Sequence, residues 1–463
     1  MRGPQLTSAV AAVDLGATSG RVMLGHVGHN ELSVRPVARF PNGPVEAHGE
    51  LHWDIDALYS RVLDGLAAAA REDPEICSIG VDSWAVDYAL IKGGRMLSAP
   101  FHYRDERTTP AIERVHALVS PEDLYRRNGL QFLPFNTLYQ LAAEADLAGA
   151  DEFLLVPDLI NFWLTGRAVT EQTNASTTGL VDIETGRWDD PLIELLGLPR
   201  RIFPELIAPG TTVGTPRPEL NLPGTVTAVG SHDTASAVVA VPATDPDFAY
   251  ISCGTWGLVG VELEAPVLTA ASREANFTNE RGVDGRVRYL HNVMGLWLLG
   301  ECLREWNHHD LPELLAAASG LTSPVPLFDA NDASFLARGD MPARISRWCV
   351  ERGLEPPRSR VEFVRSIIES LSVAFVDAVR TASDLSGKSV TVIHIVGGGS
   401  QNELLCQRVA DRSGMPVLAG PVEATAIGNV LIQARAQGLV TGSLEALRGL
   451  VASAFAPRQY LPR

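Results

Sequence analysis

One local pattern occurs twice in the 463-residue chain and constrains its fold more than any other feature. Residues 9–13 and 22–27 are apolar runs around a turn rich in glycine and hydroxyl groups, and residues 250–253 and 258–261 surround a similar turn. Such a pattern is typical of a β-hairpin. Because it opens both halves of the chain, it predicts two related α/β domains whose turns face each other across a cleft. The length also exceeds what one hydrophobic core usually organises.

The clearest linker is formed by residues 242–247, where two prolines and two acids separate apolar segments. We therefore expect an N-terminal domain over residues 1–242 and a C-terminal domain over residues 243–463. The linker would act as the hinge on which the two domains close around their ligands.

Composition and charge narrow the class of protein. The formal net charge is -17, whereas a nucleic-acid partner requires a basic face. Five scattered cysteines without a C-x-x-C pair argue against a disulfide framework or a structural zinc. The apolar patch within residues 1–13 is too short for a signal peptide, and no apolar run is long enough to span a bilayer. We expect a cytoplasmic monomer or homodimer that binds small molecules and neither nucleic acid nor membrane.

An aspartate, Asp233, follows a predicted strand over residues 225–229 and precedes a small-residue segment, continued by residues 237–241, that is typical of a helix. In open α/β sheets, ligands bind where the carboxyl ends of strands meet. The N–H groups at the start of a helix also favour an ionised carboxylate. Two interpretations remain open from this segment alone: a catalytic carboxylate, and an ordinary helix cap.

The first hairpin turn, residues 14–21, combines a carboxylate, two glycines, two hydroxyls and a guanidinium. Glycines allow the backbone to approach a ligand closely, and hydroxyl and N–H groups donate to phosphate oxygens. Asp14 is suited to hold Mg²⁺ directly or through water. The alternative is a plain polar turn.

Other segments show the periodicity of regular structure. Helical spacing is found at residues 55–70, 292–306 and 361–385, and β-branched runs predict strands at residues 76–81 and 390–396. The first of these strands runs into Asp82, Trp84 and Asp87. That arrangement suits a platform for a sugar, although the segment taken alone favours a buried tryptophan beside two surface acids.

Two segments resemble known nucleotide-binding motifs but lack glycines that those motifs require. Residues 382–389 resemble a Walker A loop, but Ala382 replaces the first glycine and the strand follows the segment instead of preceding it, so Gly387 is better interpreted as a helix C-cap. Residues 397–402 follow a strand as a dinucleotide fingerprint does, but Asn402 stands where a third glycine is required. A hydride-transfer enzyme is therefore the weaker alternative.

Polar turns thus recur at four strand ends, at residues 14–21, 230–234, 254–257 and 397–402. One carboxylate can accept a proton from a hydroxyl, and glycine turns can hold phosphates with their metal. These are the parts that a phosphoryl-transfer enzyme needs, and they require no Walker lysine.

Seven segments resemble the FGGY carbohydrate kinases, within the superfamily of sugar kinases, actin and Hsp70. They are VDLGATSGRVML (residues 13–24), QFLPFNTLYQL (131–141), SHDTASAV (231–238), CGTWGL (253–258), NVMGLWLL (292–299), HIVGGGSQN (394–402) and GPVEATAIGN (420–429). The resemblance implies an α/β fold with two ribonuclease H-like, actin-like ATPase domains around a central cleft. The combination of SHDTASAV, NVMGLWLL and GPVEATAIGN is similar to family members that convert L-rhamnulose and ATP to L-rhamnulose 1-phosphate and ADP in L-rhamnose catabolism.

The resemblance also implies roles for individual residues. The N-terminal domain would bind the sugar and supply the catalytic base, Asp233, and the C-terminal domain would bind ATP. Asp14 would place Mg²⁺, through water. Nucleotide contacts are implied for Ala17, Thr18, Ser19, Gly20, Arg21, Thr255, Gly398 and Gly399. Sugar contacts are implied for Ala85, His232, Asp233, Thr234 and Asn292.

The sequence departs from its relatives at two positions. Ala85 stands where relatives tend to carry glycine, and Gly300 stands where relatives can carry a glutamine that reaches the nucleotide. Two further functions remain as alternatives: a sibling kinase for L-fuculose, L-ribulose or D-xylulose, and a sugar sensor that binds nucleotide without turnover.

Overall fold

The computed structural model of the chain describes residues 8–28, 31–308 and 310–463. Residues 1–7, which belong to the segment weighed as a leader, lie outside the described residues. Contacts divide the chain into two compact α/β units, each assembled from separate stretches. Unit 1 is Met1–Thr244, Glu262–Tyr289 and Ala424–Ala454, and unit 2 is Asp245–Val261, Leu290–Glu423 and Phe455–Arg463. The domain boundary at residue 242 stays a prediction.

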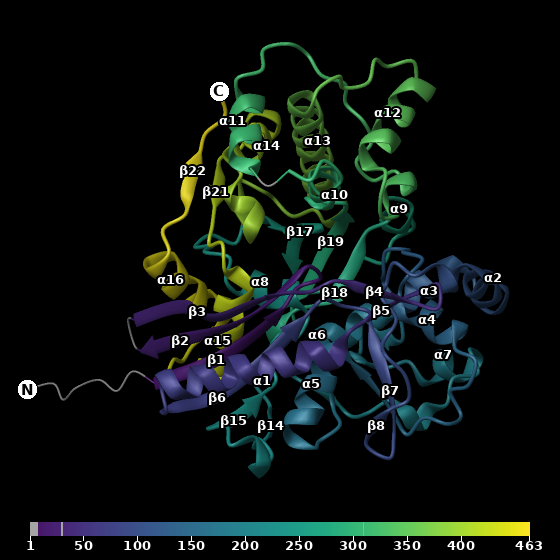
Figure 1. Ribbon diagram of the computed structural model, residues 1–463, viewed down its shortest axis with the longest axis vertical. Coiled ribbons are helices and arrows are strands. Elements are labelled where there is room, and N and C mark those ends of the chain that lie inside the picture. Colours follow the sequence, from purple (N-terminus) through teal and green to yellow (C-terminus); the bar gives the residue numbers. More distant parts are fainter. Residues whose placement is uncertain (1–7, 29–30, 309) are drawn as a thin grey trace, which may run out of the picture. The chain divides into compact units, whose positions relative to one another are not determined.

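Unit 1 is built on a six-stranded sheet in which the predicted first hairpin is confirmed. The strand order is β14 (Thr212–Gly214), β15 (Thr225–Thr227), β6 (Ile76–Ser83), β1 (Ser8–Leu15), β2 (Ser19–Gly28), β3 (Glu31–Pro41). β1 runs antiparallel to β2 and parallel to β6 (Figure 1). Because β1 carries an almost continuous apolar run, all its residues after Ser8 are buried.

Several helices pack on this sheet. α1 (Ile55–Glu72) begins at the N-cap Asp54 and confirms the helical spacing of residues 55–70. Of the leucines and valine expected on one face, Leu58, Val62 and Leu66 are buried and Leu63 is half-buried. α15 (Ala424–Ala436) packs on β1, β6 and α8 (Asp233–Val239). A side chain at Gly25 would meet Val430 of α15 at 2.6 Å, so the glycine lets this helix lie close to β2.

A second layer of unit 1 is formed around a three-stranded sheet, β8 (Arg95–Met96), β7 (Tyr88–Lys92) and β9 (Glu152–Leu155). Its core is aromatic, with Tyr88, Phe153, Trp188 and Phe203 buried together. The helices of this region are α2 (Thr109–Leu118), α3 (Pro121–Asn128), α4 (Thr137–Ala143), α5 (Val156–Thr165), α6 (Gln172–Ala175) and α7 (Asp190–Leu195). β18 (Thr278–Arg281) and α9 (Ala270–Glu274) also belong to unit 1.

Unit 2 contains the second predicted hairpin. Its strands are neighbours in the order β19 (Val287–Val293), β17 (Gly257–Leu263), β16 (Phe248–Cys253), β20 (Val392–Val396), β21 (Val417–Ala419), β22 (Arg458–Tyr460). The first three residues of β19 and the last two of β17 are counted in unit 1. The long helix α13 (Arg360–Ser386) packs along α14 (Glu403–Ser413), as Figure 1 shows. The predicted helix over residues 361–385 is therefore confirmed, and Gly387 is its left-handed C-cap, with φ 70°.

The predicted helix over residues 292–306 is wrong at its start. Asn292 lies on β19, and helix α10 begins only at Trp297 (Trp297–Glu305). Between them Gly295 has φ 59°, a left-handed conformation that no α-helix continues through. The apolar run that suggested one helix therefore contains the end of a strand and the start of a helix. Throughout the described residues, the helices are too short or too polar to span a membrane.

Candidate functional site

The first hairpin turn is closed by an ion pair. Asp14 and Arg21 are cross-strand partners on β1 and β2, and the Arg21 Nε–H donates to Asp14 Oδ2 at 2.8 Å. Between them, Ala17 is half-buried while Thr18 and Ser19 are exposed. The carboxylate is thus held at the end of the strand, and two hydroxyl side chains beside it reach solvent.

Asn42 fixes the shape of this turn, a role that sequence reasoning missed. Its side-chain Nδ2 donates to the carbonyl of Gly16 at 2.8 Å, and its main-chain N–H donates to the carbonyl of Thr18 at 3.1 Å. Gly20, predicted to contact the nucleotide, also has a packing reason to be glycine. A Cβ there would lie 2.1 Å from the ring of buried Phe40.

Main-chain hydrogen bonds join the ends of two strands to the segment before Asp233. The N–H of Ser83, at the end of β6, donates to the carbonyl of Ser231 at 2.9 Å, and the N–H of Trp84 donates to the carbonyl of Leu15 at 3.1 Å. Segments more than 140 residues apart therefore meet at one sheet edge. This gathers the predicted residues Asp14, Ala85 and Asp233 in one region of unit 1.

Asp233 is the first residue of α8, and His232 is its N-cap. The predicted strand-to-helix transition is therefore confirmed. The Asp233 side chain keeps 30% of its surface exposed, so a substrate hydroxyl can reach it. The hydroxyl of Thr234 donates to Asp233 Oδ1 at 3.1 Å, and His232 Nε2 lies 3.4 Å from the same oxygen.

A third carboxylate, Asp82, belongs to the same region as Asp14 and Asp233. It is fully buried and pairs with Asp14 in the register of β1 and β6. Burial raises its pKa well above the ordinary value, the Asp14 carboxylate raises it further, and a 2.6 Å hydrogen bond from Asn429 Nδ2 opposes them. Asp233 adds a smaller electrostatic contribution in the same direction as Asp14, so the three acids share one neighbourhood.

The predicted sugar contact Ala85 lies in a strained turn. The N–H of Asp87 donates to the carbonyl of Ala85 at 2.9 Å, and Val86 between them has φ 69°. A β-branched residue rarely adopts such a backbone, and strain of this kind is concentrated at functional sites. Hydrogen bonds to the carbonyl of Val86 from Thr137 and Gln140 hold the turn in place.

The Asp87 side chain holds the Ala85 turn in place through hydrogen bonds. It is 1% exposed and accepts hydrogen bonds from the Trp53 and Trp84 indoles and from Gln140 Nε2, at 2.7, 3.0 and 3.0 Å. Burial raises its pKa to about 6 against the opposing donors. The interpretation of Asp82 and Asp87 as surface acids is therefore wrong, since both are buried.

In unit 2, two further turns share one sheet edge. β16 and β20 are parallel, with Ser252 paired to Val396, so the turn holding Thr255 and the turn holding Gly398 follow neighbouring strands. The carbonyls of Gly254 and Thr255 accept hydrogen bonds from the N–H groups of Leu296 and Trp297, which fixes the hairpin tip to the start of α10.

The two glycines of the turn after β20, Gly398 and Gly399, differ in the space around their Cα atoms. A Cβ at Gly399 would lie 2.2 Å from Cys253 Sγ, whereas a Cβ at Gly398 would meet nothing within 4 Å, and Gly398 is exposed. Close packing thus explains Gly399, and Gly398 offers open backbone. Asn292 is half-buried on β19, and Gly300 is exposed on α10 with open space around its Cα.

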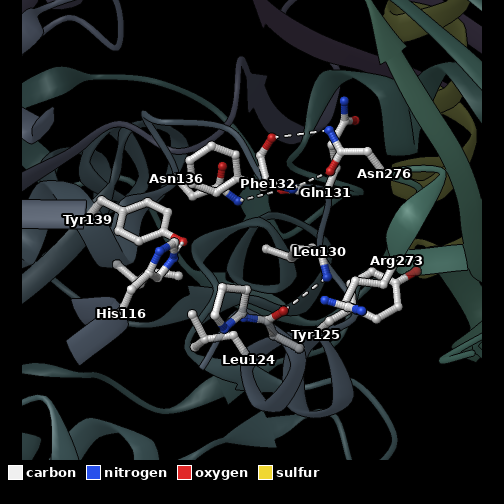
Figure 2. A pocket seen from close by; sticks show the side chains of 13 residues that line it. His116, Leu124, Tyr125, Leu130, Gln131, Phe132, Asn136, Tyr139, Arg273 and Asn276 are labelled. Atoms are coloured by element: carbon white, nitrogen blue, oxygen red, sulfur yellow. Dashed lines mark hydrogen bonds between the residues drawn. The ribbon is translucent and has the colours of Figure 1, made fainter. Parts of the chain in front are cut away.

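A cavity of about 180 Å³ lies elsewhere in unit 1 (Figure 2). Phe132, Tyr139 and His116 form its aromatic wall, with ring centroids 5.6 to 5.9 Å apart. None of the predicted site residues lines it. The described residues also hold no group of three His, Cys, Asp or Glu side chains arranged to ligate a metal.

Comparisons with known proteins cover nearly the whole chain. The N-terminal domain of the FGGY family of carbohydrate kinases matches residues 9–240, and its C-terminal domain matches residues 249–437. A rhamnulokinase of Bacteroides thetaiotaomicron is 41% identical over 98% of this chain and 95% of its own length. A rhamnulokinase of Bacillus subtilis is 38% identical over the same shares.

Solved structures agree on the fold. A gluconate kinase from Lactobacillus acidophilus superposes with a TM-score of 0.79 at 17% identity, over 99% of this chain and 94% of that chain. A xylulose kinase from the same organism superposes with a TM-score of 0.79 at 17% identity, over 98% and 94%. At this level of identity, the likeness concerns the fold alone.

Proposed function

The chain belongs to the FGGY family of carbohydrate kinases, and from that premise we propose that it transfers the γ-phosphoryl group of ATP to O1 of L-rhamnulose. The products are L-rhamnulose 1-phosphate and ADP, and the role is in L-rhamnose catabolism. The observation that carries the choice of sugar is the 38 to 42% identity to rhamnulokinases over 98% of the chain.

Asp233 is the catalytic base of this proposal. Its carboxylate accepts the O1 proton as that oxygen attacks the γ-phosphorus and the bond to the β-phosphate oxygen breaks. The proton can move late in a loose transition state, so an ordinary carboxylate suffices. Partial exposure and the position at the start of α8 support this role, because substrate reaches the side chain while the helix end favours its charge.

Two groups of turns would bind the nucleotide. In unit 1, residues 17–21 offer exposed hydroxyls and the Arg21 guanidinium to phosphate oxygens. In unit 2, Thr255, Gly398 and Gly399 lie at one sheet edge, and the open space at Gly398 allows the backbone to approach a ligand.

The Asp14 carboxylate, at the end of β1, fits hydrated Mg²⁺, which prefers carboxylate oxygens and keeps several of its waters. Asp14 would hold the ion through water. The ion would neutralise charge on the transferred phosphoryl group.

The sugar would contact Ala85, His232, Thr234 and Asn292. The Ala85 turn is rigid because Asp87 and Gln140 hold it, so it would present main-chain groups to hydroxyls in a fixed direction. We place the enzyme in the cytoplasm, as a monomer or homodimer.

A coupled ADP-release assay over a panel of ketoses tests the function. We expect the highest kcat/KM for L-rhamnulose among L-rhamnulose, L-fuculose, L-ribulose and D-xylulose. Preference for another ketose would overturn the choice of sugar and leave the kinase assignment intact. Nucleotide binding without ADP release on any ketose would indicate a sensor.

A further inference from the structure

A buried charged cluster lies behind His232 in unit 1. Arg288 on β19 is 0% exposed and Glu280 on β18 is 5% exposed. Arg288 Nη1 lies 3.0 Å from Glu280 Oε2, Arg288 Nη2 lies 3.1 Å from His232 Nδ1, and His232 Nδ1 lies 3.2 Å from Glu280 Oε2. The other side of the imidazole faces Asp233. His232 therefore stands between a buried ion pair and the proposed base.

The guanidinium determines which ring nitrogen carries the proton. Arginine stays protonated in proteins and only donates hydrogen bonds, so His232 Nδ1 must accept from Arg288 Nη2. A neutral ring with a bare Nδ1 carries its proton on Nε2. Nε2 lies 3.4 Å from Asp233 Oδ1, so its proton is on the Asp233 side of the ring.

Glu280 acts on the same nitrogen in the opposite direction. Its carboxylate compensates the buried guanidinium, and it would equally accept a proton-bearing Nδ1 of His232. Burial raises the pKa of Glu280, but the charge of Arg288 is the largest opposing influence, and this pKa lies below its ordinary value. The carboxylate is therefore ionised, and the balance between Glu280 and Arg288 determines the state of the ring.

We propose that Arg288 and Glu280 are positioning residues that keep His232 as the neutral tautomer protonated on Nε2. The Nε2–H then lies on the side of Asp233, with Nε2 3.4 Å from Oδ1, the oxygen that accepts from the Thr234 hydroxyl at 3.1 Å. Within the described residues, no hydrogen bond to Asp233 Oδ2 is formed, so Oδ2 is the oxygen left to accept the O1 proton. This last step rests on the proposed function, whereas the tautomer does not.

Nitrogen NMR of histidine-labelled protein tests the tautomer directly. Two-bond proton–nitrogen spectra distinguish a bare ring nitrogen from a protonated one, and His232→Gln identifies the signals. We expect a bare Nδ1 and a protonated Nε2 at pH 7 without any substrate. In Arg288→Met the proton should move to Nδ1, where Glu280 accepts it. A protonated Nδ1 in the wild type, or an unchanged tautomer in Arg288→Met, would overturn the proposal.

The pH dependence of kcat/KM for L-rhamnulose distinguishes a change in the charges around His232 from a general loss of activity. Arg288→Met leaves the Glu280 charge beside the ring, so the acid limb of the profile should move to higher pH, with kcat at pH 7 reduced about tenfold or more. Glu280→Gln leaves the guanidinium uncompensated, so the acid limb should move to lower pH. The double variant removes both charges and should return the limb toward the wild-type position.

Arg286→Met is the matched control, because Arg286 precedes β19 and its ion pairs are with Glu264 and Glu445. It should leave both the tautomer and the acid limb unchanged. Lower activity in all variants without opposite shifts of the limb would contradict the proposal. If L-rhamnulose is not the substrate, the NMR result is unaffected, so the two failures are distinguishable.

Discussion

Glu171 accepts two hydrogen bonds from Ser231, one from its main-chain N–H at 3.0 Å and one from its hydroxyl at 2.8 Å. Thr173 adds a hydroxyl donor to the same carboxylate oxygen at 2.5 Å. Glu171 is 1% exposed, and burial raises its pKa while these donors oppose the rise. The residue before His232 and Asp233 is thereby held by a carboxylate 60 positions earlier in the chain.

Glu171→Gln should therefore loosen the segment that carries the proposed base. The amide keeps one acceptor oxygen but places an NH₂ group against donors, which costs about 1–3 kcal/mol of stability. We expect a lower melting temperature and a kcat about tenfold lower, since a misplaced base is less effective. Glu194→Gln on α7, an exposed position, is the control and should change neither. Normal kcat in Glu171→Gln would show that the segment is ordered by other contacts.

Asp87→Asn should change how stability depends on pH. The folded-state pKa is about 6, above the ordinary 3.8, so the folded state binds the proton more tightly than the unfolded state. Its contribution to the free energy of unfolding is fully present below about pH 4 and is lost as pH rises through about 6. The loss amounts to about 3 kcal/mol for a shift of about two units.

Urea unfolding of the wild type and Asp87→Asn at pH 4.5 and pH 7.5 measures this contribution of Asp87 to the free energy of unfolding. The wild type should gain stability relative to the variant at the lower pH, because the asparagine cannot titrate. Equal differences at the two pH values would mean that Asp87 is already ionised at pH 4.5.

The two glycines of the β20 turn provide a matched pair. Gly399→Ala places a methyl group 2.2 Å from Cys253 Sγ and should cost about 1–3 kcal/mol of stability. Gly398→Ala meets nothing within 4 Å, so stability should stay unchanged while the KM for ATP rises. Thermal unfolding and initial rates separate the two effects. An unchanged KM for ATP in Gly398→Ala would remove Gly398 from the proposed nucleotide site.

Gly300→Gln tests whether a side chain on α10 can reach the nucleotide. Replacing an exposed helical glycine should stabilise the protein by about 1 kcal/mol, and the open space around Gly300 accommodates the new side chain. We expect a lower KM for ATP and an unchanged KM for the sugar. Gly300→Ala provides the same gain in helix propensity without the amide. If both variants have the same KM for ATP, the glutamine makes no such contact.

The two hairpins, helices α1 and α13 and the strand before Asp233 could be predicted because each follows from apolar periodicity within one short segment. The helix over residues 292–306 could not, because an apolar run does not distinguish a buried strand from a buried helix. Gly295 was the local signal for a break, and only its left-handed backbone shows that the break occurs there.

The turns of the candidate site could be predicted from the sequence, whereas the buried residues that hold those turns in place could not. Asp14 and Asp233 stand at strand ends, which the order of apolar and polar residues indicates directly. Glu171, Glu280 and Arg288 lie on other elements and reach the site only through tertiary pairing. Sequence spacing carries no information about such contacts, although a buried arginine on a strand is costly enough to indicate a partner once its burial is known.

The most direct measurement of the central claim compares wild type and Asp233→Asn for ADP release with saturating ATP and L-rhamnulose, alongside calorimetric binding of the sugar. Asparagine keeps the shape of the side chain and removes the base. We predict a kcat lower by about 10²–10⁴ with sugar affinity within about threefold. Near-normal turnover in Asp233→Asn would contradict the assignment of Asp233 as the catalytic base.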